Sequence, residues 1–301
     1  MMDDQTAQRV LLPAQIQKFA LAAAVLALCF IVPLWKLARF AAGDELYSYI
    51  LLIPAVSAYL AWLQKKNLPP MSLPAKKAAV LFFAGGIAVT AWHSLIPLSS
   101  GLDDLARMTL AFLLFLAGAG FLILGGATMR TLSFPFALLV FLIPFPDFLR
   151  DGIETALQHG SATATGWMFA VSDVPALRED DLAFRLPTIT LQVAPECSGI
   201  HSTVVLFITS LVAGHFFLRQ PWKRAVLCLA VIPLALLRNG FRIFVLGELC
   251  THIGPQMIDS PVHHHGGPLF FALSLPPFFL LLYLLNKSGR PGRNRPPAPK
   301  T

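Results

Sequence analysis

A cysteine stands at the point where a polar segment turns into a long apolar one. The stretch VAPECSGIHSTVVLFITS holds four polar or reactive residues and a glycine at this junction: Glu196, Cys197, Ser198, His201 and Gly199. A thiol attacks a carbonyl only as the thiolate, and an apolar setting suppresses its ionisation unless a cation or a base is close by. The junction is therefore typical of a nucleophile that needs basic partners, although a cysteine in an apolar span can also serve in packing alone.

Two arginines lie within a later apolar run, LLRNGFRIFVLG. Arg238 and Arg242 are four residues apart and would share one face of a helix, with Asn239 three residues before Arg242. An ionised arginine inside a span costs on the order of 2.5–3.5 kcal/mol on insertion scales, so it normally faces a polar cavity or a partner. The pair indicates a polar site, the alternative being side chains that snorkel to the headgroups.

Histidines supply candidate bases. A triplet at residues 263–265 precedes the last apolar run, and His201 would share the helix face of the cysteine if that helix began at Ser198. An imidazole can take a proton from a thiol and return it to a leaving amine. The alternatives are a solvated loop, a satisfied interfacial histidine, or a metal site that includes Cys250 and His252. Because adjacent histidines rarely all bind one ion, we expect no metal and no cofactor.

The composition places these residues in a polytopic membrane protein. Of the 301 residues, 56% are hydrophobic and only 13% are charged, and the mean hydropathy of +0.67 is far above that of a soluble domain. Eight apolar runs approach the length that crosses about 30 Å of hydrocarbon. They are residues 19–35, 47–63, 78–97, 108–124, 132–146, 200–218, 225–249 and 269–285, of which the fifth is short and contains prolines. We expect an all-α fold of about eight transmembrane helices.

The basic residues predict the orientation, because short cytoplasmic loops accumulate lysine and arginine. With both termini in the cytoplasm, nearly every short loop obeys this rule, and the exceptions are Lys36, Arg39 and Arg107. The net charge of +7 is then a signature of topology and requires no nucleic-acid partner. Because the last three spans alternate in direction, the cysteine, the arginine pair and the histidine triplet all fall at the outer membrane edge.

A cap and a tail complete the predicted organisation. We expect one membrane-embedded domain over residues 1–286, with a small extracytoplasmic cap at about residues 147–196. Within the cap, residues 147–173 are compatible with an interfacial helix, and residues 182–196 alternate like a short β-hairpin. The Pro- and Arg-rich residues 287–301 are typical of a disordered cytoplasmic tail beside the membrane lipids.

Together these motifs resemble the exosortase/archaeosortase family of membrane-embedded cysteine transpeptidases. The resemblance runs from DELYSYILLIPAVSAYLAWLQKK through LSFPFALLVFLIPFP and ITLQVAPECSGIHS to RNGFRI and HHHGGPLFF. Its sharpest elements are Cys-Ser-Gly, Asn-x-x-Arg and His-x-x-x-Gly-x-x-x-Phe, in this order along the chain. Matched position by position, the family pattern implies Cys197 as the nucleophile, Arg242 as the catalytic arginine and His263 as the third member.

Two departures from the pattern leave roles open. His264 competes with His263 for the third position, and Arg238 adds a second arginine beside the family position. A histidine as third member, where archaeal relatives can have arginine, favours the bacterial branch. Supporting roles are open to the remaining polar or small residues of the motifs: Glu196, Ser198, Gly199, His201 and Asn239.

The resemblance implies an enzyme that processes exported proteins. Their C-terminal sorting signal, of which PEP-CTERM is the best known, combines a short motif, one transmembrane helix and a basic tail. Cleavage would leave a thioacyl-enzyme, to be resolved by an amine or hydroxyl acceptor on a lipid or glycan, or by water. The enzyme would lie in the bacterial cytoplasmic (inner) membrane with its site at the extracytoplasmic face. Two other classes stay open: a polytopic transporter that uses the arginines, and a non-enzymatic assembly factor for surface polysaccharide.

Overall fold

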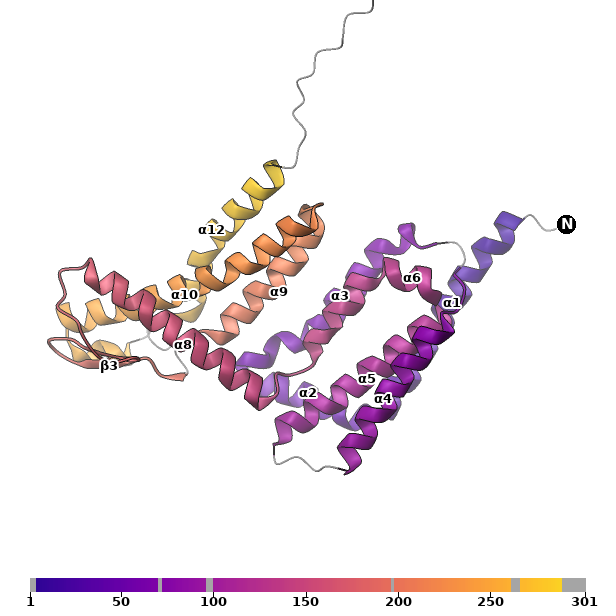
Figure 1. The fold of residues 1–301 in the computed structure, drawn as a ribbon, viewed down its shortest axis with the longest axis horizontal. Coiled ribbons are helices and arrows are strands. Elements are labelled where there is room, and N and C mark those ends of the chain that lie inside the picture. The colour runs from indigo at the N-terminus through magenta and orange to yellow at the C-terminus, as the bar shows by residue number, and fades with distance from the viewer. Residues whose placement is uncertain (1–3, 70–71, 96–99, 196–197, 261–265, 289–301) are drawn as a thin grey trace, which may run out of the picture. The chain divides into compact units, whose positions relative to one another are not determined.

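The computed structural model describes residues 4–69, 72–95, 100–195, 198–260 and 266–288. The chain forms two compact units, Met1–Arg150 and Asp151–Thr301. Helices dominate both units, and the second unit also contains a small sheet (Figure 1). The fold is all-α apart from this sheet, as the composition and the apolar runs predict.

Among its described residues, the first unit contains helices and short connecting segments but no β-strand. Helices α4 and α5 pack closely, because glycines let their backbones approach: a Cβ on Gly86 would lie 3.1 Å from the Phe115 ring, and one on Gly118 would lie 3.0 Å from the Phe83 ring. The helices are α1 (Asp4–Cys29), α2 (Ile31–Gly43), η1 (Glu45–Leu51), α3 (Ile53–Leu63), η2 (Gln64–Asn67), α4 (Lys76–Leu95), α5 (Gly101–Ile123), α6 (Gly125–Thr131), α7 (Ser133–Leu138) and η3 (Leu139–Leu142).

Two of the eight predicted spans fall in bent helix pairs, and the bounds of the fifth were wrong, because its bent pair covers Gly125–Leu142 rather than residues 132–146. The break between α1 and α2 turns the chain by 79°, and the break between α6 and α7 turns it by 70°. Each break lies three residues before a proline, Pro33 and Pro135 respectively. A proline donates no hydrogen bond to the carbonyl four residues earlier and clashes with it, so the helix breaks just after that carbonyl. The prolines of the fifth run stand out in the sequence, whereas Pro33 in the first run gave no expectation of a bend.

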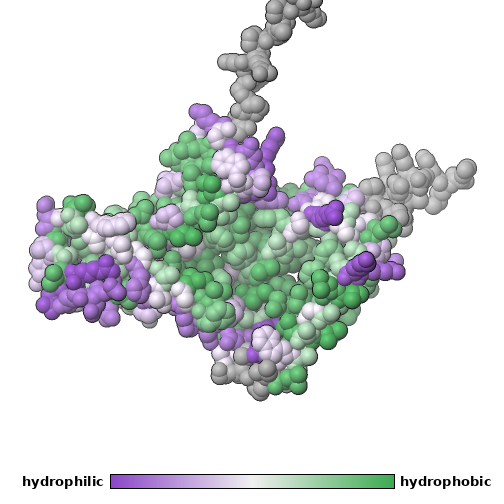
Figure 2. All heavy atoms as spheres, in the orientation of Figure 1, coloured by the Kyte–Doolittle hydropathy of each residue, from purple (hydrophilic) through white to green (hydrophobic). Residues whose placement is uncertain are grey.

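The remaining six spans are confirmed as unbroken apolar helical segments. They are residues Glu45–Asn67, Lys76–Leu95, Gly101–Ile123, Ile200–Phe217, Pro221–His252 and Gly267–Lys287. Counting each bent pair as one span gives eight, so the described residues contain six to eight candidate spans. Hydrophobic residues cover the exposed sides of the helices, while hydrophilic residues gather over the sheet (Figure 2). Such an apolar exterior is expected of helices that face lipid.

Arg107, an exception to the charge rule, is not a loop residue. It lies on α5, is 8% exposed, and its guanidinium stacks over the Trp92 ring of α4 at 4.6 Å from the ring centroid. A guanidinium over an indole gains electrostatic stabilisation from the ring. Its position is therefore explained by packing between α4 and α5 rather than by topology.

The second unit combines four long helices with the sheet. The predicted hairpin is present as β2 and β3, and a further strand, β1, pairs antiparallel with β2 to give the order β1-β2-β3. Its elements are α8 (Asp147–Ala170, which begins at the end of the first unit), β1 (Leu177–Asp180), β2 (Ala183–Arg185), β3 (Thr190–Gln192), α9 (Ile200–Phe217), α10 (Pro221–His252), η5 (Pro255–Asp259) and α12 (Gly267–Lys287). Helix α8 occupies the stretch predicted as an interfacial helix.

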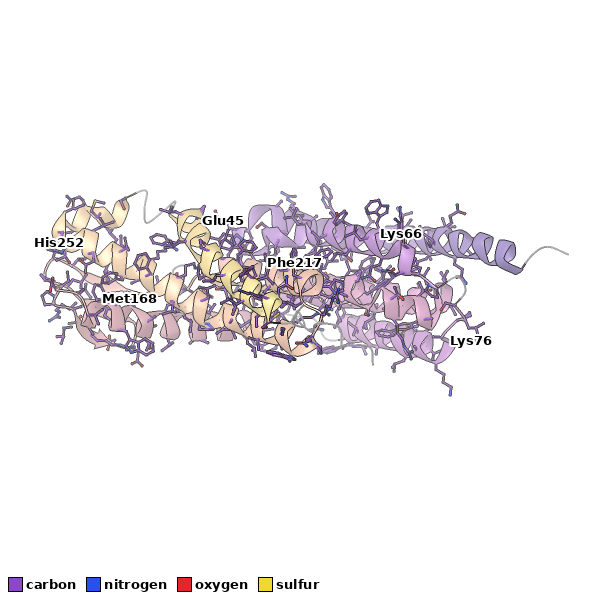
Figure 3. All side chains as sticks on the ribbon, turned by 90° about the horizontal axis from the view of Figure 1, so that it is seen from above. Glu45, Lys66, Lys76, Met168, Phe217 and His252 are labelled. Atoms are coloured by element: carbon purple, nitrogen blue, oxygen red, sulfur yellow. The ribbon has the colours of Figure 1, made fainter. Side chains whose placement is uncertain are left out.

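Glycines bring α8 and the sheet very close to α10. A Cβ on Gly240 would lie 2.8 Å from the Ala164 side chain, and one on Gly247 would lie 2.5 Å from the Phe169 ring. Thr165 Oγ1 also donates to the Gly240 carbonyl at 3.2 Å. Figure 3 shows the outcome, with Met168 of α8 alongside the His252 end of α10. This contact fixes the helix that carries the arginine pair against the cap.

Candidate active site

Four of the ten predicted site residues, Glu196, Cys197, His263 and His264, lie outside the described residues. The other six are on α9, on α10 or in the turn before α9, and are Ser198, Gly199, His201, Arg238, Asn239 and Arg242. The structure therefore defines what surrounds the C-terminal end of the Cys-Ser-Gly motif.

Gly199 forms a sharp turn at the start of α9. Its φ of +71° lies in the left-handed region that glycine adopts far more readily than other residues. Its carbonyl accepts hydrogen bonds from Thr203 N at 3.1 Å and from Thr203 Oγ1 at 2.8 Å. Because α9 begins at Ile200 rather than Ser198, the condition under which His201 would share a helix face with the cysteine is not met.

Arg238 reaches this turn from α10. It is only 7% exposed, and its Nη2 donates to the Gly199 carbonyl at 3.4 Å. Its Nη1 is buried and has no hydrogen-bond partner among the described residues. A buried donor without a partner costs about 1–3 kcal/mol, and more when it is charged. A guanidinium is thus held, at a cost, beside the residue that comes two positions after Cys197.

Asn239 packs against the same turn and ties it to α8. Its Nδ2 donates to Ser161 Oγ at 3.0 Å, and both residues are buried. A Cβ on Gly199 would lie 3.0 Å from Asn239 Oδ1 and 3.0 Å from Arg238 Nη2. Two adjacent side chains of α10 therefore clamp the turn, and Ser161 of α8, which has no motif of its own, supports Asn239.

Arg242 and His201 are half-buried, and each interacts with a neighbouring residue. Arg242 lies one helical turn beyond Arg238, since α10 is continuous through both. The predicted common helix face of the two arginines is therefore confirmed. Both lie in the half of α10 that also carries Asn239.

Cys250 and His252, two members of the alternative metal site, do not face each other, and the histidine triplet of that site lies outside the described residues. The Cys250 thiol is free and fully buried, whereas His252 is exposed and its Nε2 lies 3.3 Å from Glu248 Oε2. Residues two apart on a helix point in different directions. Across the described part of the chain, no group of three or more His, Cys, Asp or Glu side chains is placed to hold a metal ion.

Replacing Gly199 with alanine should destabilise the protein measurably. A left-handed φ costs an alanine roughly 1–2 kcal/mol of backbone strain. Its methyl group would also press on the side chains of Arg238 and Asn239. We expect a lower thermal midpoint for the purified full-length protein in detergent. Gly152→Ala is the matched control, because a Cβ there meets nothing within 4 Å. Equal midpoints for the two variants would contradict the clamped turn.

A family model described as transmembrane exosortase (Exosortase_EpsH) matches residues 35–280. The matched range covers most of the chain and contains α8, the sheet, α9 and α10, with the clamped turn between them. No curated protein and no solved structure matches the chain significantly.

Proposed function

This chain belongs to the transmembrane exosortase family, and on that premise we propose that it is a cysteine transpeptidase of the bacterial cytoplasmic membrane. Its substrates are exported proteins with a C-terminal sorting signal made of a short motif, a transmembrane helix and a basic tail. The active site lies at the extracytoplasmic face, with Cys197, Arg242 and His263 in the catalytic roles.

The clamped turn at Gly199 is the observation that carries this proposal. Arg238 and Asn239 of α10 both lie against Gly199 and precede Arg242 by one turn or less. A thiolate near a fixed guanidinium is stabilised, and a rigid turn holds a nucleophile in one orientation. A transporter or an assembly factor has no need of a rigid turn directly after a cysteine.

The proposed reaction proceeds through a thioester. The Cys197 thiolate attacks the scissile carbonyl carbon, and its former proton passes through His263 to the leaving amine as the C–N bond breaks. Arg242 stabilises the negative charge that develops on the carbonyl oxygen. An amine or hydroxyl acceptor, or water, then attacks the thioester, loses its proton through the histidine, and releases the thiol.

Mass spectrometry of a substrate tests the proposal directly. A candidate exported protein with a C-terminal motif, helix and basic tail is expressed with and without this protein, and its new C-terminus is measured. We expect a shortened chain that carries the mass of the acceptor, or an unmodified carboxylate where water resolves the thioester. An identical, uncleaved C-terminus in both strains would refute the proposal.

His263→Ala should reduce processing far more than His264→Ala. The family pattern aligns His263 with the third catalytic position, and loss of a general acid and base typically costs about 10²–10⁴-fold in rate. Processing is compared at matched membrane levels of the two variants, with His201→Ala as a third. A defect confined to His264→Ala would place the motif one residue later in the chain.

A further inference from the structure

Three buried polar side chains lie along one face of α8. They are Gln158, Ser161 and Thr165, which are three and four residues apart and are 7%, 0% and 0% exposed. Buried polar groups are costly unless they are hydrogen-bonded. Each of the three is bonded to another element of the second unit, so this face of α8 positions its neighbours as well as packing against them.

Gln158 holds the chain shortly before Cys197. Its Nε2 donates to the Val193 carbonyl at 3.1 Å, and Val193 is 2% exposed. Strand β3 ends at Gln192, so this carbonyl lies just beyond the paired residues of the sheet. The Val193 N–H donates to the Leu182 carbonyl at 2.8 Å. Both backbone polar groups of Val193 are thus fixed four residues before the proposed nucleophile.

Ser161 supports the chain shortly after Cys197, one helical turn farther along α8. Its Oγ accepts from Asn239 Nδ2 at 3.0 Å, and Asn239 lies against Gly199 in the clamped turn. The two supports are neighbours on one helix face, and the two points that they fix are Val193 and Gly199. Helix α8 therefore fixes the chain on both sides of the cysteine.

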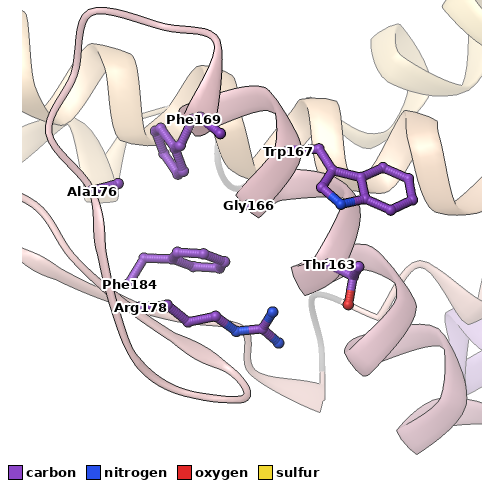
Figure 4. Close-up of a pocket in the computed structure, with 8 residues that line it drawn as sticks. Thr163, Gly166, Trp167, Phe169, Ala176, Arg178 and Phe184 are labelled. Carbon is purple, nitrogen blue, oxygen red and sulfur yellow. The ribbon is translucent and has the colours of Figure 1, made fainter.

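Helix α8 is itself firmly packed. Phe169 packs on Phe184 of β2 and on Phe244 of α10, with 5.7 Å and 5.2 Å between the ring centroids. Phe169 and Gly166 of α8 line one hollow together with Phe184 (Figure 4). Because aromatic pairs at these distances are stabilising, the helix is a fixed reference for the residues that bond to its polar face.

We infer that Gln158 is a positioning residue, which holds the nucleophile in place relative to the arginines of α10 by fixing Val193. The inference rests on the proposed function, in which Cys197 is that nucleophile. A displacement of about 1 Å can cost a reaction about 10²-fold in rate. A glutamine amide suits the role because it donates a hydrogen bond without adding a charge. Its side chain is almost completely buried, so we expect its loss to lower kcat and to leave KM nearly unchanged.

Alkylation of Cys197 tests this role without a substrate. The full-length protein, with Cys29, Cys228 and Cys250 replaced by alanine, is purified in detergent, and its rate of alkylation by iodoacetamide is measured against pH. A thiol held beside a guanidinium ionises at a lower pH than a free thiol. Gln158→Met fills a similar space but cannot donate to the carbonyl. We expect it to move half-maximal alkylation to a higher pH by about one unit, because the thiol is no longer held beside its cation.

Ser57→Ala is the matched control. Ser57 is 5% exposed and donates to the Pro135 carbonyl at 2.7 Å, so this variant also removes one buried bond from a side chain to a distant carbonyl. Both variants should lower the thermal midpoint, because each leaves a carbonyl without its side-chain donor. Only Gln158→Met should change the pH of half-maximal alkylation.

Gln158→Glu separates the hydrogen bond from the shape of the side chain. A protonated carboxyl group can donate to the Val193 carbonyl, whereas an ionised one cannot. Processing rates at saturating substrate are measured in the background that keeps all cysteines, and each is divided by the parent rate at the same pH. We expect Gln158→Glu to approach the parent as the pH falls, and Gln158→Met to stay about ten- to hundred-fold below it at every pH.

Three outcomes overturn the inference: the same pH of half-maximal alkylation in Gln158→Met and the parent, an equal shift in Ser57→Ala, or a Gln158→Glu rate as low as that of Gln158→Met at every pH. A parent protein that cleaves no substrate, although its Cys197 alkylation depends on Gln158, would refute the proposed function alone. Substrate cleavage together with alkylation that Gln158→Met leaves unchanged would refute the positioning role alone.

Discussion

Cys197→Ala should abolish processing of every substrate that the parent protein cleaves, while the variant still accumulates in the membrane. No other group at the proposed site can form the thioester, and loss of a nucleophile of this kind typically costs about four orders of magnitude or more in rate. Alanine is small and apolar, so the fold should tolerate it. The measurement is the ratio of processed to unprocessed substrate, by mass spectrometry, at matched membrane levels of enzyme.

The three other cysteines provide the controls. Cys29, Cys228 and Cys250 are free thiols on α1 and α10, and alanine in their place should leave processing intact. Cys250 is fully buried, so Cys250→Ala additionally reports whether a small packing defect alone lowers activity. Normal substrate maturation with Cys197→Ala would remove Cys197 from the mechanism.

Arg242→Lys should be nearly as inactive as Arg242→Ala. A guanidinium can hold an oxyanion or a carboxylate through two parallel hydrogen bonds and stays charged in an apolar setting, whereas a lysine is a flexible point charge that loses its proton more readily when desolvated. If Arg242 only snorkelled to headgroups, a lysine would serve almost as well. Initial processing rates at matched membrane levels distinguish the two roles, and parental rates with Arg242→Lys would reject the catalytic one.

Arg238→Lys is the matched control for this substitution. The one hydrogen bond that Arg238 makes to a described residue goes to a single carbonyl oxygen, that of Gly199, and a lysine ammonium can also donate to it. We therefore expect Arg238→Lys to keep substantial activity and Arg238→Met to lose more, because methionine leaves that contact unmade. A greater loss with Arg238→Lys than with Arg242→Lys would exchange the roles of the two arginines.

Hydropathy was sufficient to predict the helical membrane fold, because the apolar runs are a local signal in the sequence. The bend in the first span was not predicted, because Pro33 is a single proline in an otherwise continuous apolar run. The third strand, β1, was also missed. Its sequence, LRED, does not alternate apolar and polar residues, and all four residues are exposed. The strand is identified by its hydrogen-bonded pairing with β2, which the sequence does not reveal.

The site was predictable only in part. The motif residues were found from their order and their positions along the apolar runs, and α10 confirms that Arg238 and Arg242 share a face. The clamp on Gly199 was not foreseeable, because it depends on Arg238 and Asn239 reaching a turn about forty residues earlier in the chain. Ser161, which supports Asn239, is farther still along the sequence and has no motif of its own.

The close glycine contacts of α10 also bear on how members of this family can exchange parts by recombination. A cap transplanted without α10 would bring side chains shaped for another helix against Gly240 and Gly247, where the existing partners leave no space for even a methyl group. A recombination point between the sheet and α9 therefore separates α8 and the sheet from α10, the helix against which they pack without space. Helix α8, the sheet and α10 therefore form one packing unit, in which a bulkier side chain on one element requires a matching change on the others.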